Sequence, residues 1–164
     1  MTRDELLQQY DRELATTRQL LERIPADKME WRPHPKSTTM HGIGRHLAHM
    51  ITWGLLGLSE TSSDVADRTP PGPTATPGDI LAMFDRNAAA TRALVAGLSD
   101  EALRETWTLT WQGKAVMTST REAVVESMIL NHLIHHRGQL SVYLRLNDIP
   151  VPSIYGPTAD EPAR

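Results

Sequence analysis

The histidines of this sequence gather in two short windows. Five of the seven lie either at positions 46 and 49 or at 132, 135 and 136. Residues four apart on a helix lie one turn above each other on the same face. His132 and His136 can therefore present two imidazoles to one ion, as zinc-binding His-x-x-x-His pairs do. One helix cannot complete a coordination sphere, so His46 or His49 is the expected third ligand.

The spacing alone is also compatible with histidines that are merely solvated or packed in a core. The segment around the second window is strongly apolar, with Met128, Ile129, Leu133 and Leu140. Imidazoles in or beside a core need polar partners, and a metal ion is a good one. This context favours the metal site over the simpler interpretation.

The chemistry of such a site follows from its ligands. Three histidines leave coordination positions open, which is typical of catalytic rather than structural sites. Imidazole suits several divalent ions, of which zinc or nickel is expected here. Neither histidine window has a neighbouring carboxylate like that of the His-Glu-x-x-His proteases. This absence favours activation of a thiol or water by the metal itself and makes a hydrolase less expected.

Further residues near the histidines could line a substrate pocket. The two aromatic ones lie about two turns from His46 or His136, although aromatics at helical spacing more often belong to a core. Arg137 could contact a substrate anion or form a structural salt bridge. Gln139 could contact substrate or hold a ligand imidazole in place. The candidate lining residues are His49, Trp53, Arg137, Gln139 and Tyr143.

Helical periodicity and capping signals predict the elements that position these residues. Four helices are expected, over about 2–24, 38–59, 76–98 and 118–146, with a small β-hairpin over about 107–117. The segment 60–78, rich in Pro, Gly, Thr, Ser and Asp, reads as a long loop. A long connection lets the second and third helices run parallel. The sequence therefore predicts one all-α domain over 1–164, an up-down-down-up four-helix bundle with a minor hairpin.

Composition limits the partners. The chain has 164 residues, 40% hydrophobic and 23% charged, and a net charge of −3. This balance disfavours nucleic acid and anionic membranes as partners and leaves a small-molecule substrate as the expected one. The absence of cysteine excludes disulfides and thiolate ligands from the chain itself. No secretory signal is recognisable at the start, so a cytoplasmic setting is expected. An exposed, glycine-rich face of the second helix and the apolar length of the fourth helix are expected, and both predict surface left over for a homodimer.

Three sequence motifs point to a family. The run 131–146, NHLIHHRGQLSVYLRL, resembles the signature of the DinB family of metalloenzymes. PHPKS at 33–37 and PSIYGP at 152–157 resemble one of its subgroups. The resemblance implies an up-down-down-up four-helix bundle with a histidine triad on the second and fourth helices. Its His-Leu-Ala pattern falls on 46–48, which gives His46 the first ligand role and ranks His49 below it.

The same resemblance assigns the other two ligands to His132 and His136. His135 is then not a ligand, because it points about 100° away from His136. Some similar proteins are transferases or isomerases that depend on a low-molecular-weight thiol, which binds the metal as thiolate. The competing expectation is a non-catalytic, stress-response bundle in which the metal is a structural staple.

Overall fold

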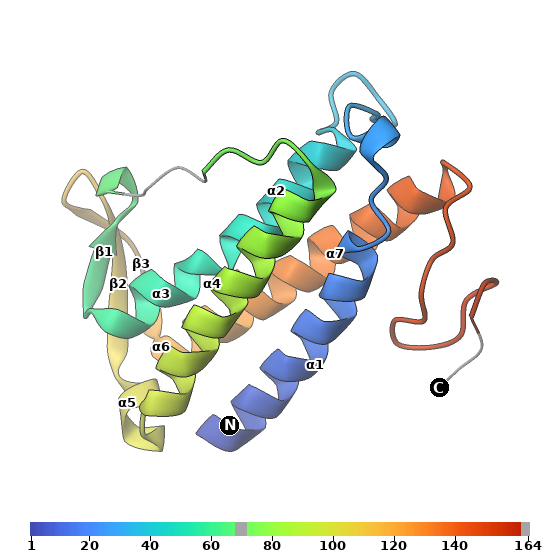
Figure 1. The fold of residues 1–164 in the computed structure, drawn as a ribbon. Coiled ribbons are helices and arrows are strands. Elements are labelled where there is room, and N and C mark those ends of the chain that lie inside the picture. Colours follow the sequence, from blue (N-terminus) through green and yellow to red (C-terminus); the bar gives the residue numbers. More distant parts are fainter. Residues whose placement is uncertain (68–71, 162–164) are drawn as a thin grey trace.

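A computed structural model describes residues 1–67 and 72–161. Helical segments form the four rods of a bundle, as Figure 1 shows. In chain order these are α1 (Arg3–Leu21), α2 (Met40–Met50) with α3 (Thr52–Ser59), α4 (Pro77–Gly97), and a last rod made of α6 (Arg121–Val124), η3 (Val125–Asn131) and α7 (His132–Arg145). Two short helical turns, η1 (Ala26–Lys28) and α5 (Asp100–Arg104), lie between them.

A threonine caps the start of each rod. Thr2 and Thr76 form capping boxes with the residues three positions later, so that two backbone donors are satisfied at each start. Thr39 accepts a hydrogen bond from the backbone of Gly42 at the start of α2. Thr120 does the same for Ala123 at the start of α6. The caps fix where each rod begins.

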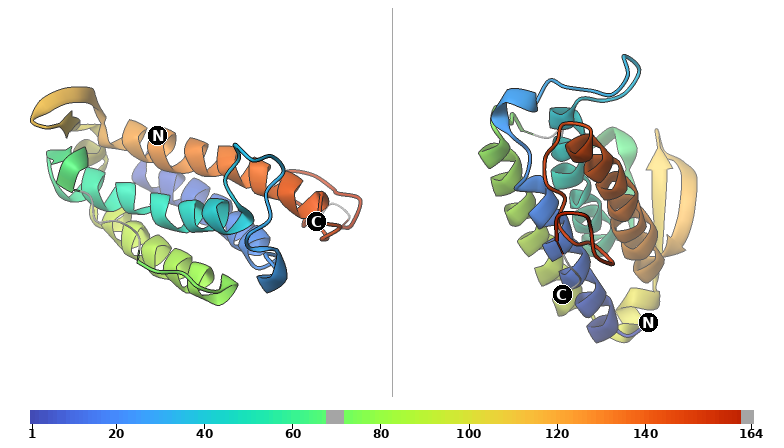
Figure 2. Two further views of the ribbon diagram at one scale, coloured as in Figure 1. Left: turned by 90° about the horizontal axis from the view of Figure 1, so that it is seen from above. Right: turned by 90° about the vertical axis from the view of Figure 1, so that its right-hand side faces the viewer.

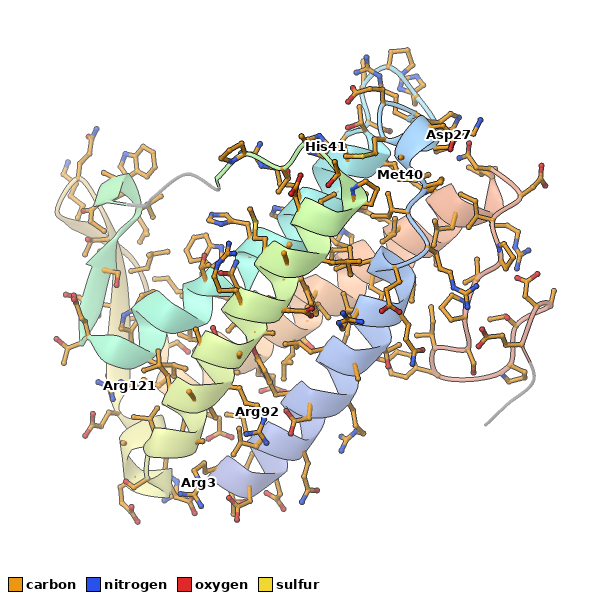
Figure 3. The ribbon with its side chains drawn as sticks, in the orientation of Figure 1. Arg3, Asp27, Met40, His41, Arg92 and Arg121 are labelled. Carbon is orange, nitrogen blue, oxygen red and sulfur yellow. The ribbon has the colours of Figure 1, made fainter. Side chains whose placement is uncertain are left out.

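Contacts between the helices define their directions. Ion pairs join Asp11 to Arg92 and Arg18 to Asp85, which makes α1 and α4 antiparallel. Asn87 donates to the carbonyl of Ala48, and α2 and α4 both begin at the same end of the bundle (Figure 1). Figure 3 places Arg3 and Arg92 at one end of the molecule and Met40 and His41 at the other. α2 and α4 therefore run in the same direction, and α1 runs in the opposite direction to both.

A small sheet covers one end of the bundle, and the C-terminal segment lies toward the other end (Figure 2). The strands of the sheet are β1 (Ser62–Asp64), β2 (Thr106–Trp111) and β3 (Lys114–Thr120), in the order β1-β2-β3. β2 and β3 pair antiparallel, and β1 pairs parallel to β2. The Asp64 carboxylate accepts backbone hydrogen bonds from Gln112 and Gly113 in the turn between β2 and β3. Part of the segment expected to be a loop is thus β1 and the following turn η2 (Val65–Asp67).

The main hydrophobic core fills the bundle, and a smaller cluster around Trp107, Leu109 and Val124 lies against the sheet. Two glycines of the second rod let its neighbours approach closely. A Cβ at Gly44 would lie 2.7 Å from Cδ1 of Ile24, and one at Gly54 only 2.5 Å from Cγ2 of Thr91. The expectation that this glycine face is exposed was therefore wrong. The homodimer stays a prediction without that support.

Helix boundaries also differ from those predicted, and α1 ends at Leu21 rather than near 24. The second rod divides at Ile51, although this residue keeps helical backbone angles. The last rod begins at Arg121 rather than at 118 or 119, because Ser119 and Thr120 pair with β2. Within the described residues, no helix is both long and apolar enough to cross a membrane.

Candidate metal centre

Three imidazoles from two rods converge on one point. Nε2 of His46, on α2, lies 3.3 Å from Nε2 of His132, at the start of α7. Nε2 of His136, one turn further along α7, lies 2.8 Å from that of His132. One potential ligand atom from each residue lies within 4.8 Å of the other two. All three side chains are partly buried.

The donor set fits a divalent ion. Nδ1 of His136 lies 2.8 Å from Oε1 of Gln139, which can only accept a hydrogen bond. The proton of His136 therefore sits on Nδ1, and the lone pair of Nε2 faces the other imidazoles. Three ligands about 2.0–2.1 Å from a tetrahedral zinc ion lie roughly 3.3 Å apart, close to the observed spacing. A cation at this point resolves the repulsion between lone pairs that face each other.

The surroundings keep two of the imidazoles neutral. Burial, followed by the neighbouring charges of His136 and His132, lowers the pKa of His46 to about 4. The pKa of His132 is also lowered, first by burial and then by His136, while a hydrogen bond with the backbone of Met128 acts in the opposite direction. Only the neutral imidazole is a metal ligand. The site is therefore prepared for metal at neutral pH.

The lowered pKa of His46 predicts how the metal-free protein responds to acid. In the unfolded chain His46 binds a proton below about 6.5, whereas in the folded protein it does so only near 4. The unfolded state binds more protons between these values, so the free energy of unfolding should fall as pH drops from 6.5 toward 4. Urea unfolding in the presence of a chelator measures this. The His46→Gln variant should show a weaker dependence, and parallel curves for both proteins would contradict the assignment.

A π-helical segment leads directly into the site. η3 spans Val125–Asn131, and His132 is the first residue of α7. The backbone N–H of His132 donates to the carbonyl of Ile129, three residues back. Its imidazole is hydrogen bonded with the backbone of Met128, four residues back. π-helical turns occur frequently at functional sites. This element was missed in the sequence, where the last rod reads as one regular helix.

The structure separates the other candidate residues. His49 lies on α2 outside the convergent group, although its charge contributes to the lowered pKa of His46. Trp53 is partly buried and packs against both hydrophobic clusters. Tyr143 belongs to the core, and its hydroxyl donates to the carbonyl of Thr38 at 3.3 Å. Gln139 holds the His136 imidazole rather than facing the point of convergence.

Arg137 and His135 flank His136 and have different environments. Arg137 is 1% exposed and forms an ion pair with Glu13 of α1. Of the two roles expected for it, the structure contains the salt bridge. A contact of this arginine with a substrate anion is not supported. His135 is exposed and lies outside the convergent group, with its ring centroid 4.8 Å from that of His136. Nε2 of His135 lies 3.1 Å from Nε2 of Gln139.

Comparison with known proteins connects this fold and site to a family. The model of the DinB superfamily matches residues 9–140. The protein YrdA of Bacillus subtilis is 24% identical over 166 residues, covering 99% of this chain and 93% of YrdA.

Solved structures agree in fold. A DinB-like protein from Bacillus cereus superposes with a TM-score of 0.77 at 19% identity, covering 94% of this chain and 98% of that one. YfiT from Bacillus subtilis, described as a probable metal-dependent hydrolase with an unusual four-helix bundle topology, superposes with a TM-score of 0.66 at 20% identity. The match to YfiT covers 89% of this chain and 87% of the other. The family model, together with this shared fold, confirms the resemblance seen in the sequence: the chain belongs to the DinB superfamily.

Proposed function

We propose that this protein is a divalent-metal-dependent enzyme in which His46, His132 and His136 hold a zinc or nickel ion. The substrate is a small molecule, and the attacking nucleophile is the thiolate of a low-molecular-weight thiol. The reaction class is a transfer or an isomerisation. The observation that carries the proposal is the convergence of three imidazole nitrogens from two helices.

The composition of the ligand group supports activation of an anionic nucleophile. Among the described residues, the convergent group consists of three histidines and contains no carboxylate. Neutral ligands leave the full charge of a divalent ion uncompensated. Such an ion, when bound, lowers the pKa of a coordinated thiol or water and favours the anion. The protein contributes by keeping His46 and His132 neutral and by orienting all three imidazoles.

The lack of a carboxylate in the group favours a thiol over water. A free thiol has a pKa near 8.5, so a modest decrease makes it a thiolate at neutral pH. Water starts near 15.7 and needs a far larger decrease, which hydrolases of the His-Glu-x-x-His type support with a glutamate as general base. A thiol can lose its proton to solvent without such a base.

Two alternatives remain distinct from this proposal. The description of YfiT favours a hydrolase that uses water at the same site. The second alternative is a bundle without catalytic activity, in which the metal is a structural staple. The core argues against the staple, because apolar residues fill the bundle and the histidines are only partly buried.

Metal analysis and metal removal test the proposal. Protein purified without a histidine tag should hold about one zinc or nickel ion per chain after dialysis. Removing the ion should abolish transfer of a small thiol to an electrophilic substrate, while circular dichroism should show that the helices persist. Loss of the helical signal on chelation would favour the staple instead. Metal-dependent cleavage of esters or amides without any thiol would favour the hydrolase.

A further inference from the structure

A hydrogen-bonded chain of three side chains lies on the outer face of α7. Oε1 of Gln139 lies 2.8 Å from Nδ1 of His136. Nε2 of the same amide lies 3.1 Å from Nε2 of His135. His135 and Gln139 are four residues apart and both are exposed, so they are neighbours on one helix face. The chain therefore joins an exposed histidine that is outside the convergent group to one that is inside it.

We propose that Gln139 and His135 are positioning residues that hold His136 in the tautomer that can bind metal. The inference rests on the proposed function for its consequence, because the tautomer matters once His136 is a ligand. It concerns residues of the chain that do not touch the ion themselves. Gln139 acts directly on the ring of His136, and His135 acts through Gln139.

The two ends of an amide impose opposite tautomers. The oxygen of Gln139 can only accept, so it requires a proton on Nδ1 of His136 and leaves the lone pair of Nε2 free. With the amide turned around, its NH₂ group would donate to Nδ1, and the proton would sit on Nε2. That proton would face Nε2 of His132, 2.8 Å away, and occupy the position of a ligand lone pair. The direction in which this one amide faces therefore decides whether His136 can be a ligand.

His135 selects between the two directions of the amide. Because the amide nitrogen of Gln139 only donates, its contact with His135 pairs the NH₂ group with the lone pair of Nε2, the tautomer of His135 whose proton is on Nδ1. This contact leaves only the oxygen of the amide for His136. Without His135, the exposed amide would exchange its NH₂ contact for one with water, and neither direction would be favoured. Partners of this kind outside the ligands themselves fix ligand tautomer and orientation in metal sites.

Exposure of both residues makes the inference testable without loss of the fold. Substitutions at exposed positions away from the core change stability little. Gln139→Leu removes both ends of the amide. Gln139→Glu keeps an acceptor for Nδ1 of His136 and is the conservative rescue. His135→Ala removes only the contact that fixes the direction of the Gln139 amide. Gln8→Leu, at an exposed glutamine of α1, is the matched control.

Two measurements are needed, one of which requires no metal. Long-range ¹H–¹⁵N NMR of the metal-free protein reports which nitrogen of His136 carries the proton. Competition with a chelating dye gives the affinity for Zn²⁺ alone. Wild type, Gln8→Leu and Gln139→Glu should show the proton on Nδ1 and similar affinities. Gln139→Leu should shift the proton toward Nε2 and weaken Zn²⁺ binding by about 10- to 100-fold. His135→Ala should show a mixture of tautomers and a smaller loss of affinity.

Other outcomes would overturn the inference. A positioning role for Gln139 predicts that Gln139→Leu weakens Zn²⁺ affinity by about 10-fold or more. An affinity within about twofold of wild type, or the wild-type tautomer in Gln139→Leu, would reject this role. A Gln139→Glu protein as weak as Gln139→Leu would reject the acceptor as the operative group. An unmixed tautomer in His135→Ala would remove His135 from the proposal. If wild type binds no Zn²⁺, the proposed function fails, yet the tautomers of the metal-free variants still decide the inference.

Discussion

Replacing His132 or His136 by alanine is expected to abolish stoichiometric metal binding. In the proposed site the two residues are adjacent ligands from one helix, and Nε2 of one lies 2.8 Å from Nε2 of the other. A single remaining histidine on α7 cannot chelate, and the loss should exceed the roughly 10- to 100-fold that follows from losing an outer hydrogen-bond partner. His46→Ala should also weaken binding severely, because it removes the ligand from α2. Elemental analysis of dialysed, tag-free protein measures the metal bound per chain.

His135→Ala tests which histidines of α7 are ligands. Its ring is close to that of His136, with centroids 4.8 Å apart, but it lies outside the convergent group. It should retain stoichiometric metal, with at most the modest loss of affinity that follows from its position beside Gln139. Release of metal by His135→Ala but not by His136→Ala would show that the register assigned to α7 is wrong.

That His132 and His136 of α7 lie together could be predicted from the sequence, whereas the third histidine could not be chosen from spacing. Spacing on one helix is local, so positions 132 and 136 must share a face whatever the rest of the chain does. His46 and His49 are three apart, so they lie on a similar face of their own helix. Which of them meets the pair depends on how α2 packs against α7, a tertiary property. The family pattern favoured His46, and the structure places its Nε2 3.3 Å from that of His132.

The features that sequence reasoning missed depend on distant partners or on backbone detail. β1 lies in a segment rich in turn-forming residues, and it becomes a strand because Ser63 pairs with Leu109 far along the chain. The π-helical segment η3 has the apolar periodicity of an ordinary helix, so residue types alone do not distinguish it. Arg137 remained ambiguous for a similar reason. Its partner Glu13 is 124 residues away in the sequence.

That distant partner leads to the largest effect expected on stability. The guanidinium of Arg137 pairs with the carboxylate of Glu13 at 2.8 Å and donates to the backbone carbonyl of Glu13 at 3.1 Å. The two side chains are only 1% and 9% exposed. Tyr155 of the C-terminal segment adds a third contact, since its hydroxyl donates to the same carboxylate at 2.8 Å. Its ring also lies 5.0 Å from Cζ of Arg137. The pair thus joins α7, α1 and the C-terminal segment.

Arg137→Ala is expected to lower the free energy of unfolding by about 3–5 kcal/mol, because it leaves the buried carboxylate of Glu13 without a counter-ion. The double variant Arg137→Met with Glu13→Leu should recover much of this loss, since apolar side chains of similar volume can replace a buried pair. Urea unfolding of the metal-free proteins measures each value and keeps metal binding out of the comparison.

Arg92→Ala provides the control. Arg92 of α4 pairs with Asp11, which lies on α1 like Glu13, but both side chains of this pair are about half exposed. Exposed pairs of this kind contribute about 0–1 kcal/mol. Equal losses for Arg137→Ala and Arg92→Ala would mean that water reaches Glu13 and that its pair with Arg137 is not a buried one. A double variant less stable than Arg137→Ala would contradict this account. It would show that the hydrogen bond from Tyr155 to Glu13 stabilises the protein more than the unpaired charge of Glu13 destabilises it.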